Sequence, residues 1–230
     1  MGQSIEYARS RAVYAVRSGS HLYGLNHEKS DEDILGAFVD TPQNTLGTSP
    51  CRTVKNPAAD ETYKALSDYA KHLANGSSFW VETLFAPEDC VIVIHQSFAP
   101  FVRNRNAFLT QALITKSLGF IDAMTRLPLS DDTPNIHKQL SHAVRVGYMI
   151  IQWMESGEFC VRMPNHRDEL LDIKFNRIPI RDANAKAKQM HETIDGMLQQ
   201  CGLPEDINAN LLNNLITEST FAYWSHLGEM

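Results

Sequence analysis

The chain has 230 residues, of which 43% are hydrophobic and 21% are charged, and its formal net charge is −6. This composition is typical of a globular protein with one large domain or two modest ones. The negative charge argues against a broad surface that coats nucleic acid, although it is compatible with a local basic groove. No apolar run reaches membrane-spanning length and the first residues lack a signal-peptide pattern, so we expect no membrane association.

The cysteines are widely scattered along the chain, at Cys51, Cys90, Cys160 and Cys201. Because no Cys-x-x-Cys pair is present, the sequence predicts neither a zinc site nor a disulfide framework. The expected location is therefore the reducing cytoplasm.

The first hundred residues mix strand-like runs with helical segments. In chain order, the predicted elements are a helix at 4–11, strands at 12–16, 34–39 and 51–54, a helix from 60 to 75, a short helix at 79–84 and a strand at 91–94. A turn-rich loop over 40–50 separates the second strand from the third. The helix from Asp60 is predicted because the apolar residues after it fall on one helical face and Asn75-Gly76 can end it.

A shift in composition near residue 100 indicates a domain boundary. The later residues predict helices at 107–124, 136–155, 169–174, 182–200 and 205–224, joined by short connections. We therefore divide the chain into a first domain over 1–103 and an all-helical domain over 104–230.

The helix at 136–155 carries two stripes of opposite character. The apolar stripe recurs at steps of four and three and consists of Leu140, Val144, Gly147, Ile151 and Met154. A basic stripe with the same steps consists of Lys138, His142 and Arg145. It lies about 200° from the apolar stripe, so it faces either solvent or a cleft. We expect truncation of each basic side chain to cost only about 0.5 kcal/mol of folding free energy.

Residues 19–33, between the first two predicted strands, combine a possible phosphate-binding turn with acidic residues. Gly19-Ser20 can form a tight turn whose backbone N–H groups approach a phosphate, because Gly19 has no side chain to block it. If residues 31–33 are extended, Asp31 and Asp33 share one face and Glu32 points to the other. Two carboxylates beside such a turn suit a divalent metal that carries a nucleoside triphosphate. Taken singly, each motif also occurs in ordinary solvated turns.

This pattern resembles the nucleotidyltransferases of the DNA polymerase beta superfamily, whose signature is Gly-Ser, a spacer and Asp-x-Asp at the start of the next strand. The resemblance is closest to the branch that includes the RNA-repair-associated nucleotidyltransferases. The residues that match this branch are Gly19, Ser20, Tyr23, Gly24, Ser30, Asp31, Asp33 and Gly36. The resemblance implies an α+β fold, with a small mixed-sheet nucleotidyltransferase domain followed by an all-helical domain and the active site between them.

The resemblance continues after residue 60 with an acidic residue, a helix, a glycine and a Glu-x-Leu motif that begins at Glu82. It implies that Asp60 is the third metal-binding carboxylate. Asp60 could instead be a plain helix N-cap, and Glu61 is the neighbouring candidate. Glu82 ranks below Asp60, because it could be a solvated or capping charge. The branch also has a Lys-x-x-x-His-x-x-Arg pattern, which the basic stripe matches.

The implied activity is metal-dependent transfer of an NMP from an NTP to an acceptor hydroxyl, an EC 2.7.7 type reaction. The resemblance assigns Asp31, Asp33 and Asp60 as catalytic ligands of Mg²⁺ or Mn²⁺. It assigns Gly19 and Ser20 to the phosphates of the NTP, with ATP as the default donor. Lys138, His142 and Arg145 are assigned to the triphosphate or to an acceptor phosphate.

The acceptor is open among an RNA end, a protein side chain and a small molecule, and we favour an RNA end. The residues expected to line a short RNA groove are Arg103, Arg105, Lys116, Lys138, Arg145, Arg162 and Arg167. The alternative function is a catalytically silent nucleotide- or RNA-binding protein on the same scaffold. The retention of both Asp31 and Asp33 disfavours it, because a pure binder gains little from two adjacent like charges without a metal. A position of Asp60 remote from these two residues would favour it.

Overall fold

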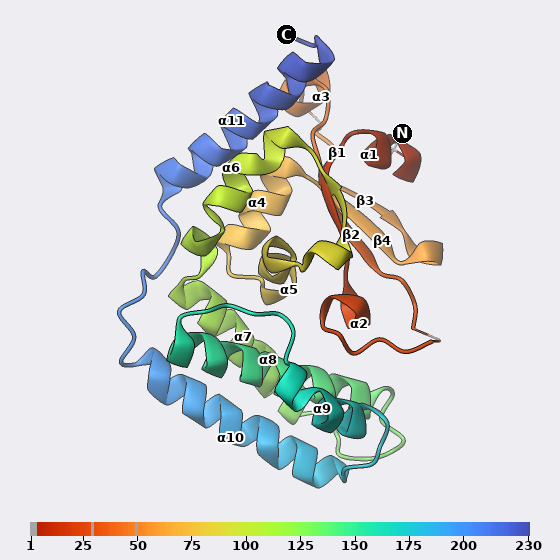
Figure 1. Ribbon diagram of the computed structural model, residues 1–230, viewed down its shortest axis with the longest axis vertical. Helices are drawn as coiled ribbons and strands as arrows, with labels where there is room; N and C mark the ends of the chain where they lie inside the picture. Colours follow the sequence, from red (N-terminus) through yellow and green to blue (C-terminus); the bar gives the residue numbers. More distant parts are fainter. Residues whose placement is uncertain (1–3, 29, 49) are drawn as a thin grey trace.

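The computed structural model describes residues 4–28, 30–48 and 50–230 and has the expected α+β architecture. Lys29 and Ser49, in predicted loops, lie outside the described residues. Figure 1 shows a sheet and short helices at one end of the molecule and a group of helices at the other. This group consists of α7 (Gln111–Thr125), α8 (Ile136–Ser156), α9 (Arg167–Lys174) and α10 (Ile180–Leu198). Among the described residues, no helix is long and apolar enough to cross a membrane.

In the described part of the chain, the strands form one mixed sheet in the order β3-β4-β2-β1-β5. The strands are β1 (Ala12–Arg17), β2 (Ile34–Phe38), β3 (Thr53–Asn56), β4 (Glu61–Ala65) and β5 (Val91–Ile94). β2 and β4 are parallel, and the other neighbouring pairs are antiparallel. The structure confirms the strands predicted at 12–16, 34–39, 51–54 and 91–94, with small shifts at their ends.

The helix predicted from Asp60 is wrong over its first residues. Residues 61–65 form the strand β4, and the helix α4 (Leu66–Ala74) begins only after it. The strand is specified by its partners, because β4 pairs with β2 on one side and with β3 on the other. Its side chains alternate, so that Tyr63 packs in the small core under α1 (Ile5–Ser10) whereas Thr62 and Lys64 line a cavity on the opposite face. Asp60 is therefore not a helix N-cap.

Two hydrophobic cores lie on the two faces of the sheet. The smaller one, under α1, includes Ala8, Phe38 and Tyr63. The larger one includes Val13 and Leu35 of the sheet and continues through the helices into α8 and α10. The other short helices are α2 (Gly19–Leu22), α3 (Pro42–Leu46), α5 (Ser78–Val81) and α6 (Ala99–Arg103). After α5, the predicted helix at 79–84 continues as a 3-10 helix, Glu82–Phe85.

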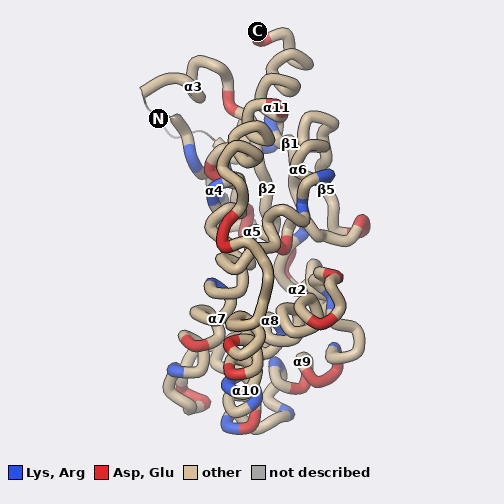
Figure 2. Tube along the Cα trace, turned by 90° about the vertical axis from the view of Figure 1, so that its left-hand side faces the viewer, with Lys and Arg blue, Asp and Glu red and all other residues tan. Residues whose placement is uncertain are grey.

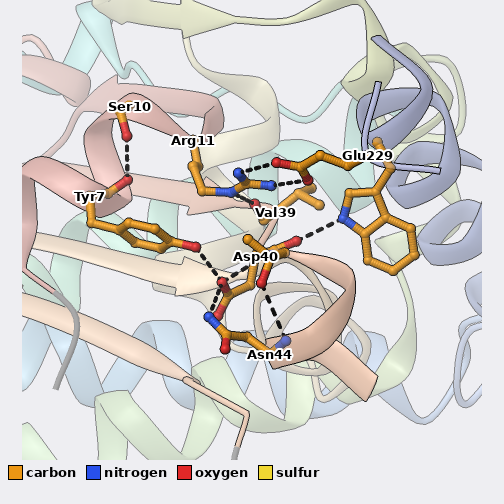
Figure 3. A network of polar contacts seen from close by, with 9 residues as sticks. Tyr7, Ser10, Arg11, Val39, Asp40, Asn44 and Glu229 are labelled. Carbon is orange, nitrogen blue, oxygen red and sulfur yellow. Dashed lines mark hydrogen bonds and ion pairs between the residues drawn. The ribbon is translucent and has the colours of Figure 1, made fainter. Parts of the chain in front are cut away.

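The helices predicted in the second half are confirmed, although their ends shift by a few residues. The last one, α11 (Ala209–Leu227), returns to the sheet end of the molecule and packs against α4 and α6 (Figure 1). The indole Nε1 of Trp224 donates to the carbonyl oxygen of Asp40 at 2.7 Å. Arg11 pairs with Glu229 at 2.7 Å and donates to the Val39 carbonyl oxygen at 2.7 Å (Figure 3). The division at residues 103 and 104 stays a prediction, and α11 contacts the first segment across it.

Candidate active site

The turn at Gly19 brings the two sequence motifs into direct contact. Gly19 begins α2 with φ +57°, a left-handed conformation that glycine adopts far more readily than other residues. A Cβ atom added to Gly19 would lie 1.9 Å from Oδ2 of Asp33. The Ser18 N–H also donates to the Asp33 carbonyl oxygen at 2.7 Å. Glycine at this position therefore allows both the turn and the close approach of the Asp33 carboxylate.

The register of the parallel strands places Asp60 beside Asp33. Ile34 of β2 is level with Glu61 of β4, so the residues that precede them lie at the same edge of the sheet. The Ile34 N–H donates to the Asp60 carbonyl oxygen at 3.1 Å. Burial raises the pKa of Asp33, and the charges of Asp60 and Asp31 raise it further. Negative charge is thus concentrated at this edge.

Asp60 lies in a tight turn with φ +44°, whereas the side chain of its neighbour Glu61 pairs with a residue of α1. Aspartate is one of the few side chains that tolerates the left-handed region. Glu61 is only 2% exposed, and its carboxylate pairs with Arg9 from α1. This pairing occupies the carboxylate of Glu61, which also contributes to the lining of the cavity. Glu32 pairs with Arg17, as expected for a side chain that points away from Asp31 and Asp33.

The carboxylates fit a metal ion that is shared with a substrate better than a cage made by the protein alone. Among the described residues, no group of three His, Cys, Asp or Glu side chains is arranged to hold a metal ion. Mg²⁺ usually keeps several waters and binds one or two carboxylates together with substrate phosphates. The negative charges of Asp31 and Asp60 repel the Asp33 carboxylate. A divalent cation bound to Asp33 would relieve this repulsion.

The basic stripe of α8 lines the same cavity as this edge of the sheet, and Arg145 in it forms a buried ion pair. Its side chain pairs with Glu82 at 3.2 Å, and the exposed fractions of the two side chains are 4% and 0%. The guanidinium carbon lies 3.5 Å from the ring centroid of Tyr23, which follows α2. Arg145 therefore connects α8, the 3-10 helix at Glu82–Phe85 and the end of α2.

This burial corrects two expectations from the sequence. Glu82 is the buried partner of Arg145 and not a solvated or capping charge. Removal of one partner from a buried ion pair typically costs about 3–5 kcal/mol, because the other charge stays buried without compensation. The expected loss of about 0.5 kcal/mol is therefore wrong for Arg145. Lys138, which lies about two turns before Arg145 on the same helix, is exposed.

His142 is held in its neutral form beside this ion pair. Its ring meets the Tyr23 ring edge to face, with centroids 5.9 Å apart. Burial lowers the pKa of His142 to about 3, and the charges of Arg145, Lys138 and Lys174 contribute. At neutral pH, His142 can offer a hydrogen bond but no positive charge.

All of the residues that the sequence assigned to the site line one cavity of about 1060 Å³. These residues are Gly19, Ser20, Asp31, Asp33, Asp60, Lys138, His142 and Arg145. Sequence reasoning missed Lys174 at the end of α9, and it missed Phe79 and Phe120, which supply apolar and aromatic surface to the same cavity. Position 174 ends a predicted helix, and only the packing of α9 against α8 brings it to the site.

The arginines expected in an RNA groove have other partners. Arg162 pairs with Asp89 at 2.7 Å and donates to the His21 carbonyl oxygen at 3.3 Å. Arg167 donates to the Gly24 carbonyl oxygen at 2.9 Å. These contacts tie the segment around α9 to the end of α2. Acidic and basic residues are interspersed along α10 (Figure 2), so this helix presents no basic stripe either.

Comparison with known protein families gives one match. A sequence model of the RNA repair pathway DNA polymerase beta family matches residues 2–215. Searches of curated proteins and of solved structures give no match.

We predict that Arg145→Met lowers the free energy of unfolding by about 3–5 kcal/mol, because the substitution leaves the Glu82 carboxylate buried without a counter-charge. The double variant Arg145→Met with Glu82→Met should recover most of this loss, because it removes both charges and keeps apolar volume. Urea denaturation measures both effects. Lys138→Met is the matched control on the same helix and should change stability by less than about 0.5 kcal/mol. Equal losses for Arg145→Met and Lys138→Met would contradict the buried pair.

We also predict that His142 stays neutral in the folded protein down to mildly acidic pH. Because its pKa is about 3 when folded and near 6.5 when unfolded, only the unfolded chain takes up this proton between these values. The contribution of His142 to stability is thus present above about pH 6.5 and is lost as the pH falls toward 3. NMR titration of the imidazole and denaturation across this range provide the measurements. A His142→Gln variant with the same pH dependence as the unmodified protein would contradict the prediction.

Proposed function

Because the chain belongs to the RNA repair pathway DNA polymerase beta family, we propose that it is a metal-dependent nucleotidyltransferase that moves an NMP from an NTP to an acceptor hydroxyl. The observation that carries this proposal is the contact between the Gly19 turn and the Asp33 carboxylate, with Asp60 alongside in register. This arrangement puts a phosphate-binding turn and metal-binding oxygens at one edge of a cavity.

In the proposed reaction, Asp31, Asp33 and Asp60 would hold Mg²⁺ or Mn²⁺. The chemistry supplied by a bound ion would be neutralisation of charge on the phosphate oxygens and easier ionisation of the attacking hydroxyl. The Gly19 and Ser20 backbone N–H groups and the Ser20 hydroxyl hold the β- and γ-phosphates. The acceptor oxygen forms a bond to the α-phosphorus, the bond from this phosphorus to the β-phosphate oxygen breaks, and pyrophosphate leaves. Asp60 accepts the proton of the acceptor hydroxyl.

The position of Asp60 also bears on the alternative, a catalytically silent binding protein. Asp60 is adjacent to Asp33 through the Ile34 hydrogen bond, and its charge contributes to the raised pKa of Asp33. A protein that only binds a nucleotide gains nothing from concentrating carboxylates beside anionic phosphates. The arrangement therefore supports the enzyme over the silent protein.

The finer parts of the proposal are the donor, the acceptor and the location. We take ATP as the default donor and an RNA end as the acceptor. The family description refers to an RNA repair pathway, which supports an RNA acceptor. Cys90, Cys160 and Cys201 are free thiols, in keeping with a reducing cytoplasm.

We predict that Asp31→Asn and Asp33→Asn each lower the rate of nucleotidyl transfer at least about 100-fold, equivalent to about 2.7 kcal/mol of transition-state stabilisation. Each change removes one ligand charge and keeps the shape of the side chain. The assay uses labelled NTPs, Mg²⁺ and a mixture of cellular RNA and protein, and it follows label in products. Glu32→Gln is the matched control and should retain activity, because Glu32 pairs with Arg17 away from the cavity. Near-normal turnover by Asp33→Asn would contradict the assignment of Asp33 as a metal ligand.

A separate prediction concerns the acceptor. A short single-stranded RNA should bind with a shallow salt dependence, equivalent to about two to four phosphate contacts, because few cations line the cavity and the net charge is −6. The measurement is the affinity of a labelled oligonucleotide across a salt series. No binding at low salt would exclude the RNA acceptor and would leave nucleotidyl transfer to a protein or a small molecule.

A further inference from the structure

Two lysines from different helices line the cavity, and the charge of one of them, Lys138, acts to lower the pKa of Asp33. Lys138 lies in the first turn of α8, and Lys174 is the last residue of α9. Within the part of the chain that the structure describes, neither ammonium makes a hydrogen bond or an ion pair with a carboxylate. The Lys174 nitrogen lies over the ring of Phe175, 5.6 Å from the ring centroid.

The two ammonium groups belong to the lining of the same cavity. Burial lowers the pKa of Lys174, and the charge of Lys138 lowers it further. Both charges also act on His142, which lies on the same helix as Lys138. A pair of like charges in a partly desolvated cavity is unfavourable unless a ligand of opposite charge bridges them. The side of the cavity formed by α8 and α9 is therefore suited to an anionic ligand.

The position of this side of the cavity relative to α2 is fixed by the protein. Arg167, the first residue of α9, donates to the Gly24 carbonyl oxygen, and Arg162 donates to the carbonyl oxygens of His21 and Leu22. Lys174 is thus carried on a helix that is attached to the segment that follows the Gly19 turn. A phosphate chain that begins at Ser20 would stay within the same cavity as Lys174.

We propose that Lys138 and Lys174 form a clamp for the terminal phosphates of a nucleoside triphosphate, with His142 as a hydrogen-bonding neighbour. The inference rests on the proposed function and deepens it, because it assigns the recognition of the polyphosphate to Lys174. Lysine binds phosphate as a point charge, so two lysines favour a ligand with several adjacent anionic oxygens. The clamp therefore distinguishes a nucleoside triphosphate from a monophosphate.

The first test measures binding without catalysis. Inorganic triphosphate is titrated into the protein in buffer that contains Mg²⁺, and binding is followed by calorimetry. Lys174→Gln should weaken binding about tenfold or more, whereas Lys174→Arg, which keeps the charge, should retain most of it. Lys188→Gln is the matched control, because Lys188 is an exposed lysine on α10 outside this cavity. Unchanged affinity in Lys174→Gln, or an equal loss in Lys188→Gln, would overturn the clamp.

The second test separates the clamp from the proposed function. In the transfer assay, Lys174→Gln should raise KM for the NTP about tenfold and leave KM for the acceptor unchanged. Transfer with an unchanged KM for the NTP would overturn the clamp and leave the nucleotidyltransferase standing. Binding of triphosphate that depends on Lys174, in a protein that transfers label to no acceptor, would support the clamp and reject the proposed reaction.

Discussion

The buried ion pair between Arg145 and Glu82 is the interaction on which the geometry of the cavity depends. Both side chains are almost fully removed from solvent, and the guanidinium lies against the Tyr23 ring. A displacement of α8 would separate these two charges at a place where water cannot replace the lost partner. The position of α8 relative to Glu82 is therefore strongly restrained. The pair thereby holds α8, which carries Lys138 and His142, against the cavity that the carboxylates line.

On the opposite side of the cavity, backbone constraints hold the carboxylates in position. The parallel register of β2 and β4 aligns Asp33 with Asp60, and the hydrogen bond from Ile34 to Asp60 locks the alignment. Gly19 leaves the space that the Asp33 carboxylate occupies. Gly36 does the same for the aromatic ring of Tyr63, since an added Cβ would lie 2.4 Å from it. One motif glycine thus supports the site directly, and the other supports the sheet beneath it.

Local patterns in the sequence predicted the segments that carry the site, because turn residues and helical periodicity are properties of neighbouring positions. The Gly19–Gly36 motif and the helix around Lys138 are of this kind. Pairing between distant segments was beyond such patterns. β4 is a strand because β2 and β3 flank it, and a helical wheel could place Arg145 opposite the apolar stripe but could not reveal that Glu82 and Tyr23 cover it. Lys174 reaches the cavity through the packing of α9 on α8, so its role had no local signature.

The mixture of charges in the cavity limits what can fill it. Asp31, Asp33 and Asp60 border the sheet side together with Lys55 and Lys64, whereas Lys138 and Lys174 border the side formed by α8 and α9. A simple anion would satisfy the lysines and be repelled by the carboxylates, and a lone cation would do the reverse. A ligand that meets both demands must combine a cation with a polyanion in one complex. A nucleoside triphosphate that carries a divalent metal has this composition, so the electrostatics of the cavity and the family of the chain lead independently to the same class of substrate.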